Sequence, residues 1–217
     1  MKFKSFAAAL LLLALAACTS PAERFKVRGI VSDTLAAMPE SMVYIIGADG
    51  VADSVKVKDG AFSYSGSKDE TKLYTVMLRF PGRTERDTRF IATFVPDSEL
   101  INIDLDYPVT VTGSPLTDAV NSFQEQVMNL YYEQEEVSPE GAEEDPAVAD
   151  SLYRARMQKI VSLSRDTYLA NTENVLGLQA ISLLVTELDR AELEALLELG
   201  GESIRENKQL KELIESK

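Results

Sequence analysis

The chain has 217 residues, 45% of them hydrophobic, and its 22 Lys and Arg against 35 Asp and Glu give a net charge of −13. It has no histidine and a single cysteine, which excludes Ser-His-Asp and Cys-His catalytic sites, histidine-based zinc sites, internal disulfide bonds and CxxC redox chemistry. A chain this acidic and without a basic stripe is not expected to bind nucleic acid, and we predict no cofactor and no metal.

Residues 1–17 have the pattern of a secretory signal peptide. Lys2 and Lys4 make the start positive, and the apolar run that follows is too short to span a bilayer as a lasting helix. An aliphatic residue and two small residues, at 15–17, then lead directly into Cys18. This order resembles the lipobox of bacterial lipoproteins, which implies cleavage before Cys18 and acylation of its sulfur and its new amino group. The alternative is an ordinary signal peptide with a cysteine after it by chance.

Residues 18–24 are predicted to be a lipidated tether. A chain that begins at Cys18 has 20 basic and 35 acidic residues, a net charge of −15, so anionic headgroups should repel it and the lipid must anchor it. By the same resemblance, Thr19 after the cysteine favours the outer membrane, with the protein facing the periplasm. The only long apolar run is the one in the signal peptide, so no transmembrane helix is expected after it.

Residues 25–113 alternate with a period of two between turn signals, which predicts an antiparallel β-sandwich or open barrel of about seven or eight strands. Asp49-Gly50 and Asp59-Gly60 are the clearest turn signals, because glycine accepts a positive φ. The glycines at 29, 50, 60, 66 and 113 are all interpreted as turn residues. The predicted strands are 25–30, 42–46, 51–57, 61–66, 72–80, 89–95, 99–106 and 109–112.

The pattern changes at Gly113-Ser114-Pro115, which predicts a domain boundary and, over 114–217, a bundle of about four or five helices. The fold class is therefore α+β. Ser114, Asn174 and Asp189 are predicted N-caps, and Ser203 with Glu206 is predicted to form a capping box. The expected helices are 115–135, 146–170, 175–188, 190–199 and Ser203 to the end. Tyr153, Met157, Ile160, Val161 and Tyr168 are the expected buried side of the second helix.

Four segments, 25–31, 53–66, 94–106 and 113–123, together resemble the domain of unknown function 4369 of Bacteroidetes lipoproteins. The resemblance implies a β-rich domain behind a lipid tether, and it supplies no catalytic residues. Relatives often continue into a thioredoxin-like domain that carries CxxC. This chain ends at Lys217 without such a domain, so we expect no thiol–disulfide activity of its own.

Several polar groups are candidate sites, each with a structural alternative. Asp97, Glu99, Asp104 and Asp106 suit Ca²⁺ or acid–base chemistry, but a solvated strand face is the favoured interpretation. The acidic run 133–145 suits a metal or a basic partner, but is favoured as a solvated loop. Tyr64, Tyr74, Tyr131 and Tyr132 would line a groove, or else are half-buried core residues.

Arg83, Arg86 and Arg89, together with Arg79, form a local basic patch in an acidic chain. Guanidinium groups suit the carboxylates or phosphates of a partner, and the alternative is a hairpin tip paired with its own acids. Arg83, Arg86, Arg89 and the lipidation site Cys18 are the only site residues that we predict.

The leading functional hypothesis is a membrane-anchored binding or accessory module without catalytic activity. Its expected partners are membrane lipid, through acylated Cys18, and another envelope protein. One alternative is a carboxylate-dependent hydrolase of glycans, although tryptophan, the usual sugar platform, is absent. A second alternative is a partner subunit of a separate thioredoxin-like oxidoreductase.

Overall fold

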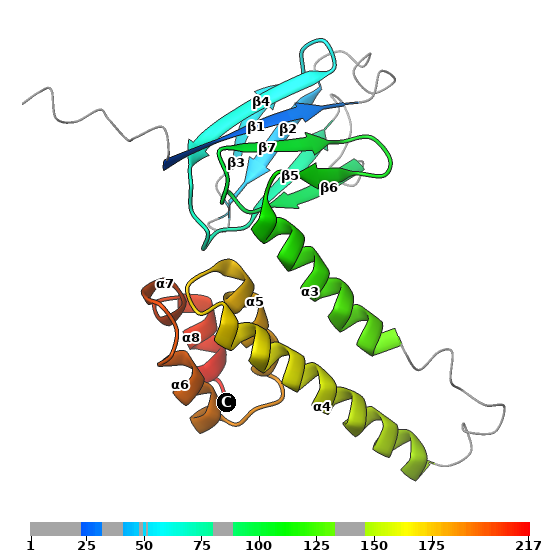
Figure 1. The fold of residues 1–217 in the computed structure, drawn as a ribbon, viewed down its shortest axis with the longest axis vertical. Helices are drawn as coiled ribbons and strands as arrows, with labels where there is room; N and C mark the ends of the chain where they lie inside the picture. The colour runs from blue at the N-terminus through cyan, green and yellow to red at the C-terminus, as the bar shows by residue number, and fades with distance from the viewer. Residues whose placement is uncertain (1–22, 32–40, 48–49, 51, 80–88, 133–145) are drawn as a thin grey trace, which may run out of the picture.

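The computed structural model describes residues 23–31, 41–47, 50, 52–79, 89–132 and 146–217. Within them, eight strands come first and six helices follow, so the predicted α+β class is confirmed. The strands form two sheets that pack as a sandwich and do not close into a barrel, and the helices gather at one end of it (Figure 1). No helix in the described part of the chain is long and apolar enough to cross a bilayer.

The sandwich has one four-stranded sheet of order β4-β1-β7-β8 and another of order β3-β2-β5-β6, called sheets A and B. All pairs are antiparallel except β1 and β7, which run parallel with Val27 opposite Ile101. A parallel pair needs a long connection, and the chain supplies it by building β2 to β6 between the two strands. The strands are β1 (Arg24–Ile30), β2 (Met42–Ile46), β3 (Ala52–Lys56), β4 (Ala61–Ser67), β5 (Tyr74–Arg79), β6 (Arg89–Phe94), β7 (Leu100–Asp104) and β8 (Thr110–Thr112).

Alternation along the strands places apolar side chains between the sheets, as predicted. Ile101, Ile103 and Leu105 are at most 1% exposed, whereas Asn102 and Asp106 are exposed. The thirteen-residue core of the sandwich is Phe25, Val27, Val31, Val43, Ile45, Phe62, Val76, Leu78, Ala92, Phe94, Ile101, Ile103 and Leu105.

Gly29 and Gly66 lie inside β1 and β4, so their interpretation as turn residues is wrong. In the register of the two strands, Phe62 stands opposite Gly29 and Phe25 stands opposite Gly66. A Cβ on Gly29 would lie 1.9 Å from ring carbons of Phe62, and one on Gly66 would lie 2.6 Å from the ring of Phe25. Each ring therefore covers the opposite glycine and fills the space that a side chain would need.

Asp59-Gly60 forms a turn, as predicted. The φ angles of the two residues are 51° and 72°, and Lys58 and Ala61 exchange two backbone hydrogen bonds of 2.9 Å. Two central residues with positive φ define a type I′ turn, whose twist suits a hairpin. This turn carries the chain from β3 in sheet B to β4 in sheet A.

The second half contains α3 (Pro115–Tyr132), α4 (Pro146–Ala170), α5 (Val175–Leu184), α6 (Arg190–Leu197), α7 (Glu202–Arg205) and α8 (Lys208–Glu215). As predicted, Asn174 caps α5, and Asp189 forms a reciprocal capping box with Glu192 at the start of α6. The predicted capping box at Ser203 is wrong. Gly201 precedes α7, and the side chain of Asn207 accepts the N–H of Leu210 and opens α8 as a separate helix.

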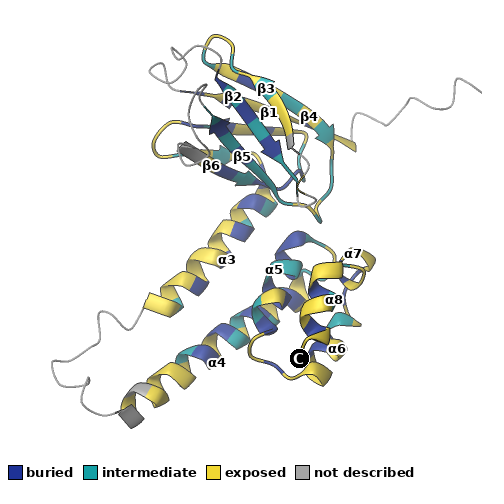
Figure 2. Cartoon of the chain, turned by 180° about the vertical axis from the view of Figure 1, so that it is seen from behind, coloured by how far each residue is buried: buried dark blue, intermediate teal, exposed yellow. Residues whose placement is uncertain are grey.

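The buried side of α4 differs from the prediction in its first half (Figure 2). Met157, Ile160 and Tyr168 are buried and Val161 is half-buried, but Tyr153 is 50% exposed. The guanidinium carbon of Arg156, on the same helix, lies 5.6 Å from the centre of the Tyr153 ring, so this ring packs on its own helix and is not part of the core. By contrast α5 is central, with six of its ten residues buried.

Candidate functional site

Buried hydroxyl groups join the end of β6 to the first turn of α3. The N–H of Val95 donates to Thr117 Oγ1 at 2.8 Å, and Ser114 Oγ donates to the carbonyl oxygen of Val95 at 3.0 Å. The two hydroxyl oxygens lie 2.5 Å apart, and the N–H of Thr117 also donates to Ser114 Oγ at 3.2 Å. Ser114 is thus the N-cap of α3, as predicted, and the cap is shared with a strand end of the sandwich.

Three of the four acids in the proposed carboxylate cluster, Asp97, Asp104 and Asp106, accept backbone N–H groups. Asp97 Oδ2 accepts the N–H of Leu116 at 2.8 Å, a further bond between the segment after β6 and the first turn of α3. Asp104 accepts the N–H of Asp106 at 2.9 Å, and Asp106 accepts the N–H of Tyr107 at 2.8 Å. In the described residues, no three acidic side chains are placed to hold a metal ion.

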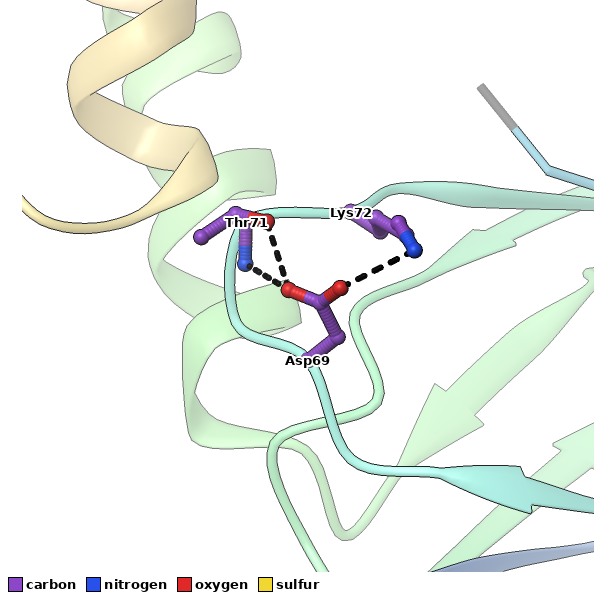
Figure 3. A network of polar contacts seen from close by, with 3 residues as sticks. All are labelled: Asp69, Thr71 and Lys72. Carbon is purple, nitrogen blue, oxygen red and sulfur yellow. Dashed lines mark hydrogen bonds and ion pairs between the residues drawn. The ribbon is translucent and has the colours of Figure 1, made fainter. Parts of the chain in front are cut away.

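The loop between β4 and β5 forms the second connection between the sandwich and the helices (Figure 3). Asp69 Oδ1 accepts the N–H of Thr71 at 3.0 Å and its hydroxyl at 2.5 Å, while Oδ2 pairs with Lys72 Nζ at 3.1 Å. The carbonyl oxygen of Glu70, in the same loop, accepts the N–H of Val175 at 2.8 Å. The Asp69 carboxylate therefore shapes the loop that receives the start of α5.

Partial burial alone would raise the pKa of Asp69. The hydrogen bonds from Thr71 and the charge of Lys72 outweigh burial and hold this pKa below its ordinary value. The carboxylate is ionised at neutral pH, which is the form that accepts all three contacts.

An apolar groove of about 570 Å³ lies between this loop, α3 and α5. Its lining is mostly apolar, and Gln124 Nε2 donates to Gln179 Oε1 at 3.1 Å from α3 to α5. Eleven residues line it: Thr71, Leu73, Phe123, Gln124, Val127, Met128, Val175, Leu178, Gln179, Ser182 and Leu183. None of these side chains carries a formal charge, so the groove suits an uncharged apolar group with a small number of hydrogen-bonding atoms.

The four predicted site residues are not brought together by the described structure. Cys18, Arg83 and Arg86 lie outside the described residues, as does the acidic run 133–145. Arg89 begins β6, where its backbone pairs with Leu78. The guanidinium carbon of Arg79 lies 4.8 Å from the centre of the Tyr44 ring, so this arginine packs on an aromatic neighbour in sheet B.

The four tyrosines of the proposed groove occupy two separate places. Tyr64 and Tyr74 are half-buried and lie 5.8 Å and 6.0 Å from the Phe25 ring in the sandwich core. Tyr131 and Tyr132 are exposed near the end of α3. None of these tyrosines lines the observed groove. The groove itself was not predicted from the sequence. Its walls come from segments about fifty residues apart, and only the helical period at Phe123 and Val127 gave a local signal.

Comparison with known families gives one match. Residues 25–120 match the family described as domain of unknown function (DUF4369). This match covers less than half of the 217 residues and ends within α3. A search of curated proteins found no match.

The DUF4369 match extends past the last strand and includes the first turn of α3. The shared cap of Ser114 and Thr117 therefore lies within the matched residues. The groove is formed at the edge of the matched region, because Thr71 and Leu73 lie within the match whereas the other nine lining residues lie beyond it.

Proposed function

We propose that this protein is a lipid-anchored accessory module of the cell envelope that binds an uncharged, mostly apolar ligand in the groove between α3 and α5. The anchor is acylated Cys18, and the protein faces the periplasm from the outer membrane. The groove is the observation that carries the binding role. Its volume of about 570 Å³ falls in the range of small-molecule sites, and its lining is apolar with a few polar groups at the rim.

The way the groove is built also supports a binding role. One wall is held by the Asp69 loop, one by α3, whose first turn is hydrogen-bonded to the sandwich, and one by α5, which Asn174 caps. Each wall is therefore positioned by hydrogen bonds outside the groove itself. A site whose walls are fixed before binding loses less free energy when a ligand is ordered in it.

The binding role is tested with the neutral apolar dye N-phenyl-1-naphthylamine and the purified mature protein. Ser182 is exposed on α5 at the groove, so Ser182→Trp should fill the groove and weaken dye binding about tenfold, or ~1.4 kcal/mol. Ser203→Trp, at an exposed position on α7, is the matched control and should bind as the wild type does. Equal dye affinity in both variants would contradict the assignment of the groove.

The anchoring role is tested by cell fractionation. Cys18→Ser should release the protein from the membrane fraction or leave it unprocessed, because the acylated sulfur is lost. A Ser variant that remains in the membrane with the mass of the wild type would contradict the anchor. This result is independent of the dye measurement.

A further inference from the structure

The outer face of sheet A carries three cations on one strand. Arg24, Lys26 and Arg28 alternate along β1 with the buried residues Phe25 and Val27, so all three side chains point away from the core and are exposed. Alternate residues of a strand are about 7 Å apart, which makes a straight row of positive charge. We call this row the basic face.

Neutral residues stand opposite the basic face on both neighbouring strands, and two exposed acids, Glu23 and Glu99, lie near its Arg24 end. In the register, Ser67, Ser65 and Ser63 of β4 stand opposite the three cations, while on β7 Leu100 stands opposite Lys26 and Asn102 opposite Arg28. In the described structure none of the three cations pairs with a carboxylate. The nearest acid on the outer side of β7 is Asp104, which stands opposite Ile30 at the far end.

The charge of the chain is unevenly divided between its halves. Residues 24–113 hold 11 Lys and Arg against 13 Asp and Glu, a net charge of −2, whereas residues 114–217 hold 9 against 21, a net charge of −12. The sandwich is therefore nearly neutral and carries a basic face, although the net charge of the whole chain is strongly negative. The helices lie at one end of the sandwich, and β4, β1 and β7 lie in front of sheet B with no helix over them in Figure 1.

We infer that the basic face is a membrane-docking surface, which lays sheet A against the anionic headgroups of the bilayer that holds the lipid anchor. This inference rests on the proposed anchor at Cys18. Arg24 is six residues after Cys18, so the tether keeps it within about 22 Å of the lipid even when fully extended. Each cation near an anionic leaflet favours association about fivefold, and these three are held in one plane with exposed Leu100 beside them.

This orientation assigns opposite places to the two halves of the protein. The basic face meets the headgroups, and the strongly acidic helical half points away from them, because like charge repels it from an anionic surface. The general expectation that the acidic chain is repelled by such headgroups thus applies to the helical half and not to sheet A.

The test attaches the mature chain to vesicles through the sulfur of Cys18, using a maleimide lipid. The geometry of the tether is then fixed by the experiment, so a failure of natural acylation and a failure of docking give different results. Lysine acetylation by a membrane-impermeant reagent is followed by mass spectrometry. Lys26 lies on the basic face, and Lys56, which is also exposed, on the outer face of sheet B, is an internal control in the same molecule.

In phosphatidylglycerol vesicles at low salt, Lys26 should be acetylated at least about threefold more slowly than Lys56, and high salt or phosphatidylcholine vesicles should abolish the difference. Arg24→Gln with Arg28→Gln should also abolish it. Arg205→Gln with Lys208→Gln, which removes the same charge from the helical half, should leave it intact. Equal rates for Lys26 and Lys56 on anionic vesicles would overturn the inference. Protection of Lys26 by soluble polyphosphate but not by vesicles would also overturn it and assign the face to a soluble polyanion.

Discussion

Thr117 lies at the first turn of α3 with its hydroxyl buried between Ser114 and the backbone of Val95. It accepts a hydrogen bond of 2.8 Å from the N–H of Val95. The hydroxyl therefore stabilises both the helix start and the strand end. A side chain of the same shape without oxygen would leave the buried N–H unsatisfied.

Thr117→Val should lower the free energy of unfolding by about 1–3 kcal/mol, because it keeps the volume and removes the acceptor. Thr110→Val, at an exposed position on β8, should change it by less than about 0.5 kcal/mol. Urea denaturation of both variants measures the difference. A Thr117 variant as stable as the Thr110 variant would mean that the shared cap contributes little.

Substitutions at Gly29 and Phe62 test whether the Phe62 ring can pack in the core only with a glycine opposite it. Gly29→Ala places a methyl group 1.9 Å from the ring position, so overpacking should cost about 1–3 kcal/mol of stability. Phe62→Ala should cost about 3–5 kcal/mol through the cavity it creates. Because the smaller side chain removes the clash, the double variant should be more stable than the sum of the two losses predicts. Strict additivity in denaturant unfolding would contradict the packing described here.

Tyr168 is fully buried and donates its hydroxyl hydrogen to the carbonyl oxygen of Leu196 at 2.8 Å. Burial raises the pKa of Tyr168 above its ordinary value, so the folded protein keeps this proton at a pH where the unfolded chain loses it. The stability due to this group is therefore complete below about pH 10, the unfolded pKa, and declines above it.

Tyr168→Phe should cost about 1 kcal/mol at neutral pH through the lost hydrogen bond. It should also make the loss of stability above about pH 10 less steep than in the wild type. Tyr64, whose pKa is raised by burial and by the nearby Tyr74, remains in both proteins and serves as the common background. Parallel stability curves above that pH would contradict the role assigned to Tyr168.

At the scale of elements, the β4–β5 loop connects the sandwich to α5 and forms one wall of the groove. Asp69→Ala should remove the contacts to Thr71 and Lys72, lower stability by about 1 kcal/mol and weaken dye binding in the groove. Asp166→Ala, at an exposed site on α4, should do neither. Normal dye affinity in the Asp69 variant would show that the loop does not need its carboxylate to form the groove.

The Asp69 carboxylate also affects how the free energy of unfolding changes at acid pH. Because the pKa of Asp69 is below its ordinary value in the folded protein, its contribution is present above about pH 4, the unfolded pKa. It declines as the pH falls through the folded pKa. In the Asp69→Ala variant, stability should therefore depend less on pH below about pH 4 than in the wild type, as measured by urea denaturation at each pH.

Element boundaries could be predicted wherever the signal is local. The alternation of Ile101 and Ile103, the turn at Asp59-Gly60 and the caps at Ser114 and Asp189 each depend on a few consecutive residues. The errors arose where distant residues decide. Gly29 falls within the predicted strand 25–30, but its role there could not be recognised without knowing that Phe62 stands across from it. The part of α4 that is covered likewise depends on α5, which packs against it.

At the scale of the whole molecule, the groove and the basic face both depend on tertiary placement. The groove joins the β4–β5 loop, α3 and α5, and no spacing within one of them indicates the others. The three cations of β1 are visible in the sequence. That they share one face follows from the buried residues between them, and that neutral residues stand opposite them follows from the strand pairing. The net charge of the whole chain, by contrast, predicted repulsion from anionic headgroups.

The proposed anchor at Cys18 decides where the groove and the basic face operate. The most direct measurement is the mass of the N-terminal peptide of the protein isolated from its native membrane. A peptide that begins at Cys18 and carries glyceryl and acyl groups is the expected result. A peptide that begins elsewhere, or an unmodified Cys18, would contradict the account.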